Sequence, residues 1–404
     1  MAYMGAQGFT ASVSLGGLLA IPFLRFQKLQ PYALIWFGFL LWTLILSIFG
    51  SNAEALFEGN LLEGNFGVNA PAARFATLIL AGMGVMIACL QIPLGSGKTS
   101  LAVSRACVIV QGIGVLITAF FMTSIIGAII SAGMSDPASM LQNLLRNANA
   151  FALVLPLLLV WIWRDAPARI KTLLATSLIS TLMLACWLTG TQAGMLGLLV
   201  MITFMALTKA LPNLGLSAIF TGLAGYVMVA PLIIPFGVKL ALNLGLPLPA
   251  SFFSRAMGWQ LVGEKISQAP LFGHGIEASY QWTELYSDRP ALLAQAEARF
   301  GENMGWANYE ILNSHPHNMP LQIWVETGFI GASLAALTLI FLGFRLQTIL
   351  RSRSDSRLAA AALTGICAVI CSVNYSMWNE AFWASVTIAA ALLVLDYRKS
   401  SKRV

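Results

Sequence analysis

Long apolar runs separated by short polar loops dominate the pattern of residues along the chain. A helix needs about 20 apolar residues to cross the hydrocarbon core of a membrane. The first run is short and the fourth and eighth are long, so the pattern predicts about 11–12 spans. The expected spans are residues 9–24, 32–50, 74–93, 104–132, 148–163, 169–187, 193–208, 214–240, 318–343, 358–375 and 380–396.

Composition supports the same interpretation. Of the 404 residues, 58% are hydrophobic and only 10% are charged, whereas roughly a quarter are charged in an ordinary soluble domain. The short alternating segments of a membrane β-barrel are missing from the pattern. Because lipid leaves no partner for unpaired backbone groups, the predicted fold class is all-α, a polytopic transmembrane helical bundle. The five cysteines all lie within apolar runs, which is typical of small core residues rather than disulfide partners.

Basic residues gather in every second loop and at the end of the chain, which predicts the topology. The positive-inside rule places these loops in the cytoplasm. The long segment from 245 to 316 and the amino terminus are then expected outside. The net charge of +7 follows from these loops and does not indicate nucleic acid. We expect the first part of the bundle in 1–244, one large periplasmic loop with short helices in 245–317, and the last helices with a short basic cytoplasmic tail in 318–404.

The long external segment is the main candidate for a functional region, because connections of that length usually carry function. Its first part predicts an amphipathic interfacial helix around Arg255–Ile266. A helix that merely caps the bundle is the alternative. Apolar residues recur there at helical spacing, at Phe252, Ala256, Trp259 and Val262.

Two other patterns do not predict nucleotide or metal binding. The stretch GSGKTS (95–100) lacks the earlier glycine of a phosphate-binding loop, because Ile92 occupies that position. The histidines His315 and His317 have no strong third ligand beside them, and no carboxylate cluster suggests a divalent cation. We therefore expect no metal and no cofactor.

The stretch NSHPHNMPLQIWVETGFIG (313–331) places two of the three histidines immediately before a hydrophobic helix. Asn318 is a good helix N-cap, and Pro320 suits the first turn. The start of that helix is expected to attract a phosphate through free amides and its dipole. Histidine titrates near neutrality and can accept a proton from a hydroxyl, so His317 is a candidate general base. The alternative is that His317 only caps the helix.

A polar stripe continues into this helix. Asn318, Gln322 and Glu326 recur every fourth residue, so they are expected to face a protein interior or an aqueous cavity rather than lipid. Gly328 and Gly331 permit a close helix crossing.

Two short stretches resemble the O-antigen ligase family, a branch of the bacterial ligases and polymerases that act on lipid-linked glycans. The family marker is a His followed by Asn, Ser or Gln, then nine residues and a Gly-x-x-Gly step. A second family feature is an arginine in the outer loop, followed by a tryptophan and a Pro-Leu-x-Gly-x-Gly segment. The matching residues here are His317, Asn318, Gly328 and Gly331 for the first feature, and Arg255, Trp259, Gly273 and Gly275 for the second.

One position departs from the family pattern. Members commonly carry an arginine at the external start of a middle span, where this chain has Gln192. Glutamine donates hydrogen bonds to a phosphate but carries no charge. Binding of the diphosphate would then depend on Arg255 and Gln192, with help from Arg289 or Arg299.

The resemblance implies a metal-independent enzyme of the bacterial inner membrane with its active site facing the periplasm. It would transfer a glycan from undecaprenyl diphosphate to a hydroxyl of the lipid A core, with inversion, and His317 would be the base. The four motif glycines would be structural. A polysaccharide polymerase of the same kind and a lipid or glycan transporter are the alternatives. The residues expected to orient the substrates are His315, Asn318, Gln322, Glu326 and Trp259.

Overall fold

The computed structural model describes residues 6–25, 31–50, 57–58, 67–92, 98–132 and 137–400. The first half of GSGKTS (95–97), most of the acidic loop between the second and third spans, and the last four residues lie outside the described residues. The helices are α1 (Ala6–Ala20), α2 (Pro31–Phe49), α3 (Pro71–Gln91), α4 (Lys98–Phe120), α5 (Met122–Ser131), α6 (Pro137–Asp165), α7 (Lys171–Leu188), α8 (Gln192–Ala210), α9 (Gly215–Asn243), α10 (Ala250–Gln268), α11 (Pro290–Phe300), α12 (Met319–Ile349), α13 (Ser354–Val373) and α14 (Glu380–Ser400).

Shorter elements complete the described chain. Two-residue strands β1 (Phe57–Glu58) and β2 (Gly67–Val68) pair antiparallel. The remaining elements are short 3₁₀ helices, η2 (Ile21–Phe23), η4 (Ala278–Gln281), η5 (Tyr286–Asp288), η6 (Glu302–Met304) and η7 (Trp306–Asn308).

Within the described residues, nine helices are long and apolar enough to cross a membrane, and α1 and α2 are shorter apolar helices. The chain is thus a multi-pass helical membrane protein, and a helix lies at each predicted span. The expectation of one continuous span over 104–132 was wrong. Phe121, at φ −116° and ψ 23°, leaves helical geometry, so α4 ends and the ten-residue α5 begins.

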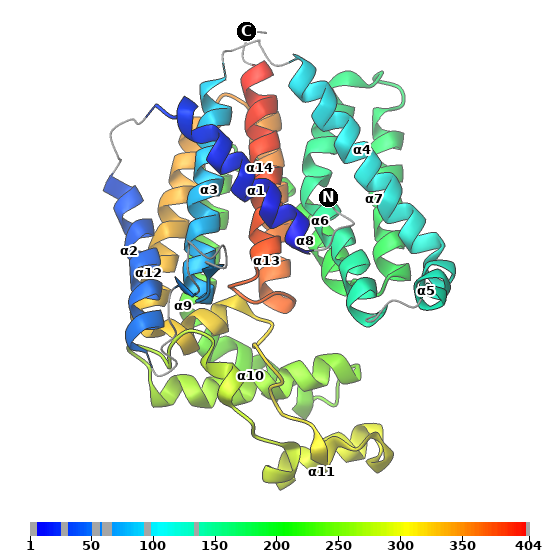
Figure 1. Ribbon diagram of the computed structural model, residues 1–404. Helices are drawn as coiled ribbons and strands as arrows, with labels where there is room; N and C mark the ends of the chain where they lie inside the picture. The colour runs from blue at the N-terminus through cyan, green and yellow to red at the C-terminus, as the bar shows by residue number, and fades with distance from the viewer. Residues whose placement is uncertain are drawn as a thin grey trace.

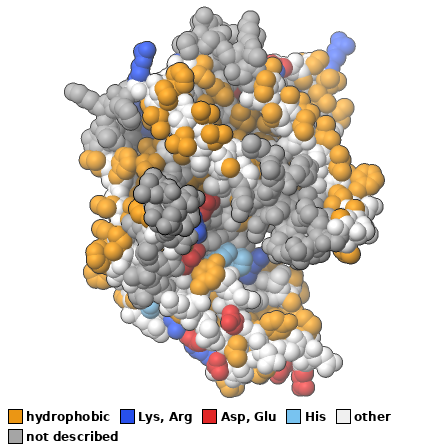
Figure 2. Space-filling model, in the orientation of Figure 1, with side chains coloured by type: hydrophobic (Ala, Val, Ile, Leu, Met, Phe, Trp, Pro, Cys, Tyr) orange, Lys and Arg blue, Asp and Glu red, His pale blue; other side chains and the backbone are white. Residues whose placement is uncertain are grey.

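The two ends of the bundle differ in character (Figure 1). Helix α14 ends at one end of the bundle, while α10 lies across the opposite end with α11 beyond it. Basic loops meet near the carboxyl terminus, where Arg164 pairs with Asp396 at 2.8 Å and the guanidinium of Arg398 donates to the carbonyl of Ile92 at 2.9 Å. On the described parts of the bundle surface, hydrophobic side chains are frequent between the two ends (Figure 2).

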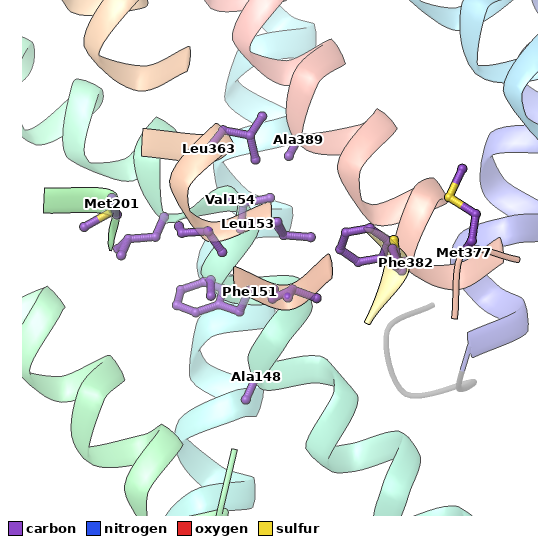
Figure 3. Close-up of a cluster of buried hydrophobic side chains, with 14 of the residues drawn as sticks. Ala148, Phe151, Leu153, Val154, Met201, Leu363, Met377, Phe382 and Ala389 are labelled. Atoms are coloured by element: carbon purple, nitrogen blue, oxygen red, sulfur yellow. The ribbon is translucent and has the colours of Figure 1, made fainter. Parts of the chain in front are cut away.

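Helices from the first and last parts of the chain share one core. α12 packs along α9, and α13 packs along α8. Figure 3 shows buried side chains of α6, α8, α13 and α14 meeting in this core, among them Leu153, Met201, Leu363 and Phe382. Residues 1–244 and 318–404 therefore form one helical bundle rather than separately packed units.

Two long helices are interrupted, and the backbone groups left without a helical hydrogen bond pair with residues from distant segments. Pro231 in α9 has no amide to donate to the carbonyl of Val227, and the indole nitrogen of Trp324 in α12 donates to that carbonyl instead, at 2.8 Å. α12 itself is interrupted at Gly328, whose φ of 64° and ψ of −167° are not helical.

The segment Pro270–Gly275 fills the interruption in α12. The amides of His274 and Gly275 donate to the carbonyls of Val325 and Glu326, at 2.8 and 3.0 Å. In return, the amide of Phe329 donates to the carbonyl of Pro270 at 2.8 Å. The backbone groups freed by the break are thereby paired, as a membrane-spanning helix requires.

Glycine is required on both sides of this contact. A Cβ on Gly328 would lie 2.3 Å from the carbonyl oxygen of Leu271, and a Cβ on Gly273 would lie 2.4 Å from the carbonyl carbon of Glu326. Both glycines also have positive φ, at 64° and 75°. The Pro-Leu-x-Gly-x-Gly segment and the Gly-x-x-Gly step of the sequence are therefore two halves of one backbone contact.

Candidate functional site

The approach to α12 has an unusual backbone. His317 has a φ of 52°, in the left-handed region that favours glycine. Asn318 then caps α12, because its side-chain oxygen accepts the amide of Leu321 at 2.9 Å, and Pro320 lies in the first turn. The predicted cap is confirmed. The same cap occupies an amide that a phosphate would need, so the start of α12 is a weaker anion site than the sequence suggested.

The imidazole of His317 is held in one orientation. Its Nδ1 lies 2.7 Å from the carbonyl oxygen of Asn374, in the loop between α13 and α14. Burial lowers the pKa of His317, the contact with Asn374 opposes this, and the positive charge of Arg255 lowers the pKa further. The ring is thus a neutral imidazole at neutral pH.

His315 lies against His317, with ring centroids 4.1 Å apart. Its Nδ1 accepts the backbone amide of His317 at 3.1 Å. Burial, then the neighbouring His317 and the charge of Arg255, lower the pKa of His315 to about 3. Both rings are therefore uncharged at neutral pH.

Arg255 and Trp259 come from α10, one helical turn apart. The indole nitrogen of Trp259 donates to the carbonyl of Pro316 at 2.7 Å, which ties α10 to the segment between the two histidines. Burial lowers the pKa of Arg255, and its charge acts on both imidazoles. Within the described part of the chain, its guanidinium makes no ion pair and lies 5.7 Å from the ring centroid of Phe252. The structure thus brings Arg255, Trp259, His315 and His317 together.

Gln322 and Glu326 are completely buried, each with 0% of its surface exposed. Glu326 accepts from the amide nitrogen of Gln322 at 2.8 Å and from the indole nitrogen of Trp378 at 2.6 Å. Gln322 also accepts the backbone amide of Met377 at 2.8 Å and donates to the hydroxyl of Ser376 at 3.0 Å. The polar stripe therefore faces the protein interior.

The expectation that Gln322 and Glu326 orient a substrate needs correction. Both side chains bind the loop between α13 and α14, and the same loop carries the carbonyl of Asn374 that orients His317. Asn318 is likewise buried and donates to the carbonyl of Ser372 at 2.9 Å. Gln322 and Glu326 thus bind the loop, whereas Asn318 binds the last turn of α13, which precedes it.

Gln192 is the first residue of α8 and is exposed. A Cβ on Gly194, in the same first turn, would lie 3.3 Å from the side-chain oxygen of Asn149. The amide nitrogen of Asn149 in turn reaches the hydroxyl of Tyr375 at 3.4 Å, next to Asn374. The start of α8 therefore lies at the same end of the bundle as His317.

Arg289 has other partners. Its guanidinium pairs with Glu264 at 3.0 Å and with Glu284 at 2.9 Å. The hydrogen bond that Arg289 donates to Glu284 raises the pKa of Arg289 above its ordinary value. Arg299 donates to the carbonyl of Leu246. These contacts hold the segment 245–316 together, so Arg289 does not offer the free positive charge that the sequence suggested.

The structure adds residues that the sequence did not indicate. The carbonyl of Asn374 and the side chain of Trp378 lie in a short turn between two spans, and Asn149 lies within an apolar helix. The only sequence signal was the polar run Asn374-Tyr375-Ser376 between apolar runs. A backbone carbonyl carries no signature in sequence at all.

Figure 2 shows histidine side chains beside a basic side chain where the bundle meets the layer of α10 and α11. Among the described residues, no three or more His, Cys, Asp or Glu side chains are grouped so as to hold a metal ion. The arrangement offers a neutral imidazole as a proton acceptor and a guanidinium for an anion. Comparisons with known protein families, with curated proteins and with solved structures found no match.

Proposed function

We propose that this protein is a membrane glycosyltransferase that moves a glycan from undecaprenyl diphosphate to an acceptor hydroxyl, at the outer end of the bundle. The lipid A core is the proposed acceptor, and the bacterial inner membrane is the proposed location. The observation that carries the proposal is the neutral imidazole of His317 beside the partly buried guanidinium of Arg255.

His317 suits the role of general base. Because Nδ1 contacts a carbonyl oxygen, which only accepts hydrogen bonds, the ring proton lies on Nδ1 and the lone pair on Nε2. The ring is neutral, so this lone pair is available at neutral pH. A fixed ring orientation is what a base needs to meet a hydroxyl at hydrogen-bond distance.

Arg255 suits the role of diphosphate binding. A guanidinium that is not neutralised by a carboxylate forms strong paired hydrogen bonds with phosphate oxygens. Burial strengthens this attraction, because less water screens the charge. Gln192 at the start of α8 would add an uncharged donor from another helix.

The reaction is a single displacement. The acceptor oxygen forms a bond to the anomeric carbon while the bond from that carbon to the diphosphate oxygen breaks. The bonding electron pair leaves on the diphosphate, next to Arg255, and the hydroxyl proton goes to Nε2 of His317. Attack opposite the leaving group inverts the anomeric configuration.

The test is a transfer assay with purified protein in lipid nanodiscs, a labelled glycan on undecaprenyl diphosphate, and a lipid A core acceptor. His317→Ala should lower the rate by about 10²–10⁴-fold. His274→Gln is the matched control, because His274 contacts the carbonyl of Lys265 through Nε2 and glutamine retains a donor there. Normal transfer by His317→Ala would refute the assignment.

The choice of acceptor separates this proposal from its nearest alternative. A ligase should label the lipid A core, whereas a polymerase should extend the glycan on a second carrier lipid. Movement of the labelled lipid between leaflets that does not depend on His317, with no transfer, would instead indicate a transporter.

A further inference from the structure

Two hydrogen bonds determine where the protons lie on the paired imidazoles. On His317, the carbonyl of Asn374 can only accept, so Nδ1 carries the proton and Nε2 has the lone pair. On His315, Nδ1 accepts the backbone amide of His317, so Nδ1 has the lone pair and the proton lies on Nε2. The adjacent rings are therefore opposite tautomers.

The two rings consequently present different groups to a ligand. His317 presents a proton acceptor and His315 presents an N–H donor, both at Nε2. Within the described part of the chain, neither Nε2 has a hydrogen-bond partner. The rings lie 4.1 Å apart between centroids and at 52° to each other, and the charge of Arg255 acts on both.

We propose that His315 donates a hydrogen bond from Nε2 to the leaving diphosphate oxygen, next to Arg255, while His317 takes the proton of the acceptor. This deepens the proposed function and rests on it. The donor strengthens its bond as negative charge develops on the leaving oxygen, which is how preorganised donors accelerate a reaction. No proton leaves His315, so the proton balance of the transfer is unchanged.

The surroundings of His315 fit a hydrogen-bond donor rather than a general acid. Burial keeps the ring neutral, so at neutral pH it has no readily released proton. A neutral donor next to a cation is complementary to an anion, whereas a second positive charge would be repelled by Arg255. Because the ring of His315 accepts a hydrogen bond from the backbone amide of His317, one short chain segment sets the relative position of the two rings.

Two substitutions separate the two contacts of His315. Asparagine places an amide near the position of Nδ1, so His315→Asn can still accept the amide of His317 but loses the donor at Nε2. Glutamine reaches the position of Nε2, so His315→Gln keeps a donor there and loses the acceptor. We expect His315→Asn to lower kcat by about 10²–10³-fold, the usual effect of removing one such donor, with little change in acceptor KM. His315→Gln should recover at least a tenth of the wild-type kcat.

A second measurement does not depend on activity. The chain has three histidines, so selective ¹⁵N labelling of histidine gives few ring signals. The ¹⁵N spectrum should show protonated Nδ1 on His317 and protonated Nε2 on His315. The inference would be overturned if both rings carried the proton on the same nitrogen. It would also be overturned if the asparagine and glutamine variants had equal kcat. Failure of the wild-type protein to transfer glycan would instead refute the proposed function, and the tautomers would still be measurable.

Discussion

The contact between Gly328 and the Pro270–Gly275 segment leads to a quantitative prediction for Gly328→Ala. The new Cβ would lie 2.3 Å from the carbonyl oxygen of Leu271 and 2.5 Å from the amide nitrogen of Phe272. These are backbone atoms, so no side-chain rotation relieves the clash. In addition, a φ of 64° with a ψ of −167° is accessible to glycine almost alone.

Two contributions set the loss of stability: backbone strain and weakened hydrogen bonds. Backbone strain at such a conformation costs about 1–3 kcal/mol. Moving Pro270–Gly275 away weakens up to four backbone hydrogen bonds, each with a net value of about 0.5–1.5 kcal/mol. With all four bonds lost, we therefore expect Gly328→Ala to lower the free energy of unfolding by about 3–9 kcal/mol.

The assay is unfolding of the purified protein by SDS in mixed micelles, followed by far-UV circular dichroism. Gly237→Ala is the matched control, because Gly237 lies in α9 with nothing within 4 Å of the new Cβ. That change should be neutral or stabilise by up to about 1 kcal/mol through helix propensity. Equal stability of the two variants would refute the role of the Gly328 contact.

Four further outcomes are expected. Arg255→Met should lower diphosphate affinity and kcat by at least tenfold, which donor KM and kcat measure. Arg289→Met should chiefly destabilise the segment 245–316, which thermal unfolding measures. Trp259→Phe removes the bond to Pro316, so kcat should fall several-fold at nearly unchanged stability. Because burial and then Arg255 lower the pKa of His317 below the ordinary 6.5, the rate should hold as pH falls through 6.5 and be lost only at lower pH; a pH–rate profile checks this. Transfer should persist in EDTA.

The positions of the helices along the chain could be predicted largely from sequence, because lipid imposes a strong constraint on length and composition. The break at Phe121 could not, because an apolar residue in an apolar run carries no signal of a bend. The interruption at Gly328 was visible only as a glycine permitting a close crossing. Its partner, Gly273, lies 55 positions earlier, and pairing the two requires the fold.

The site was predictable where a residue type carries the chemistry. His317 and Arg255 were identified by type and position, and the structure brings them together. The stripe of Gln322 and Glu326 was identified as facing away from lipid, but sequence could not distinguish a buried network from an aqueous cavity. Arg289 was misjudged because its carboxylate partners, Glu264 and Glu284, come from separate parts of the segment 245–316.

The most direct measurement of the central claim is the titration of His317 with and without the positive charge at position 255. Selective ¹⁵N labelling of histidine would follow the ring through its titration in Arg255→Met, which keeps the apolar stem, and in Arg255→Lys, which keeps the charge. The proposed arrangement predicts a higher pKa for His317 in Arg255→Met than in the wild type, and little change in Arg255→Lys. An unchanged pKa in Arg255→Met would contradict a shared site.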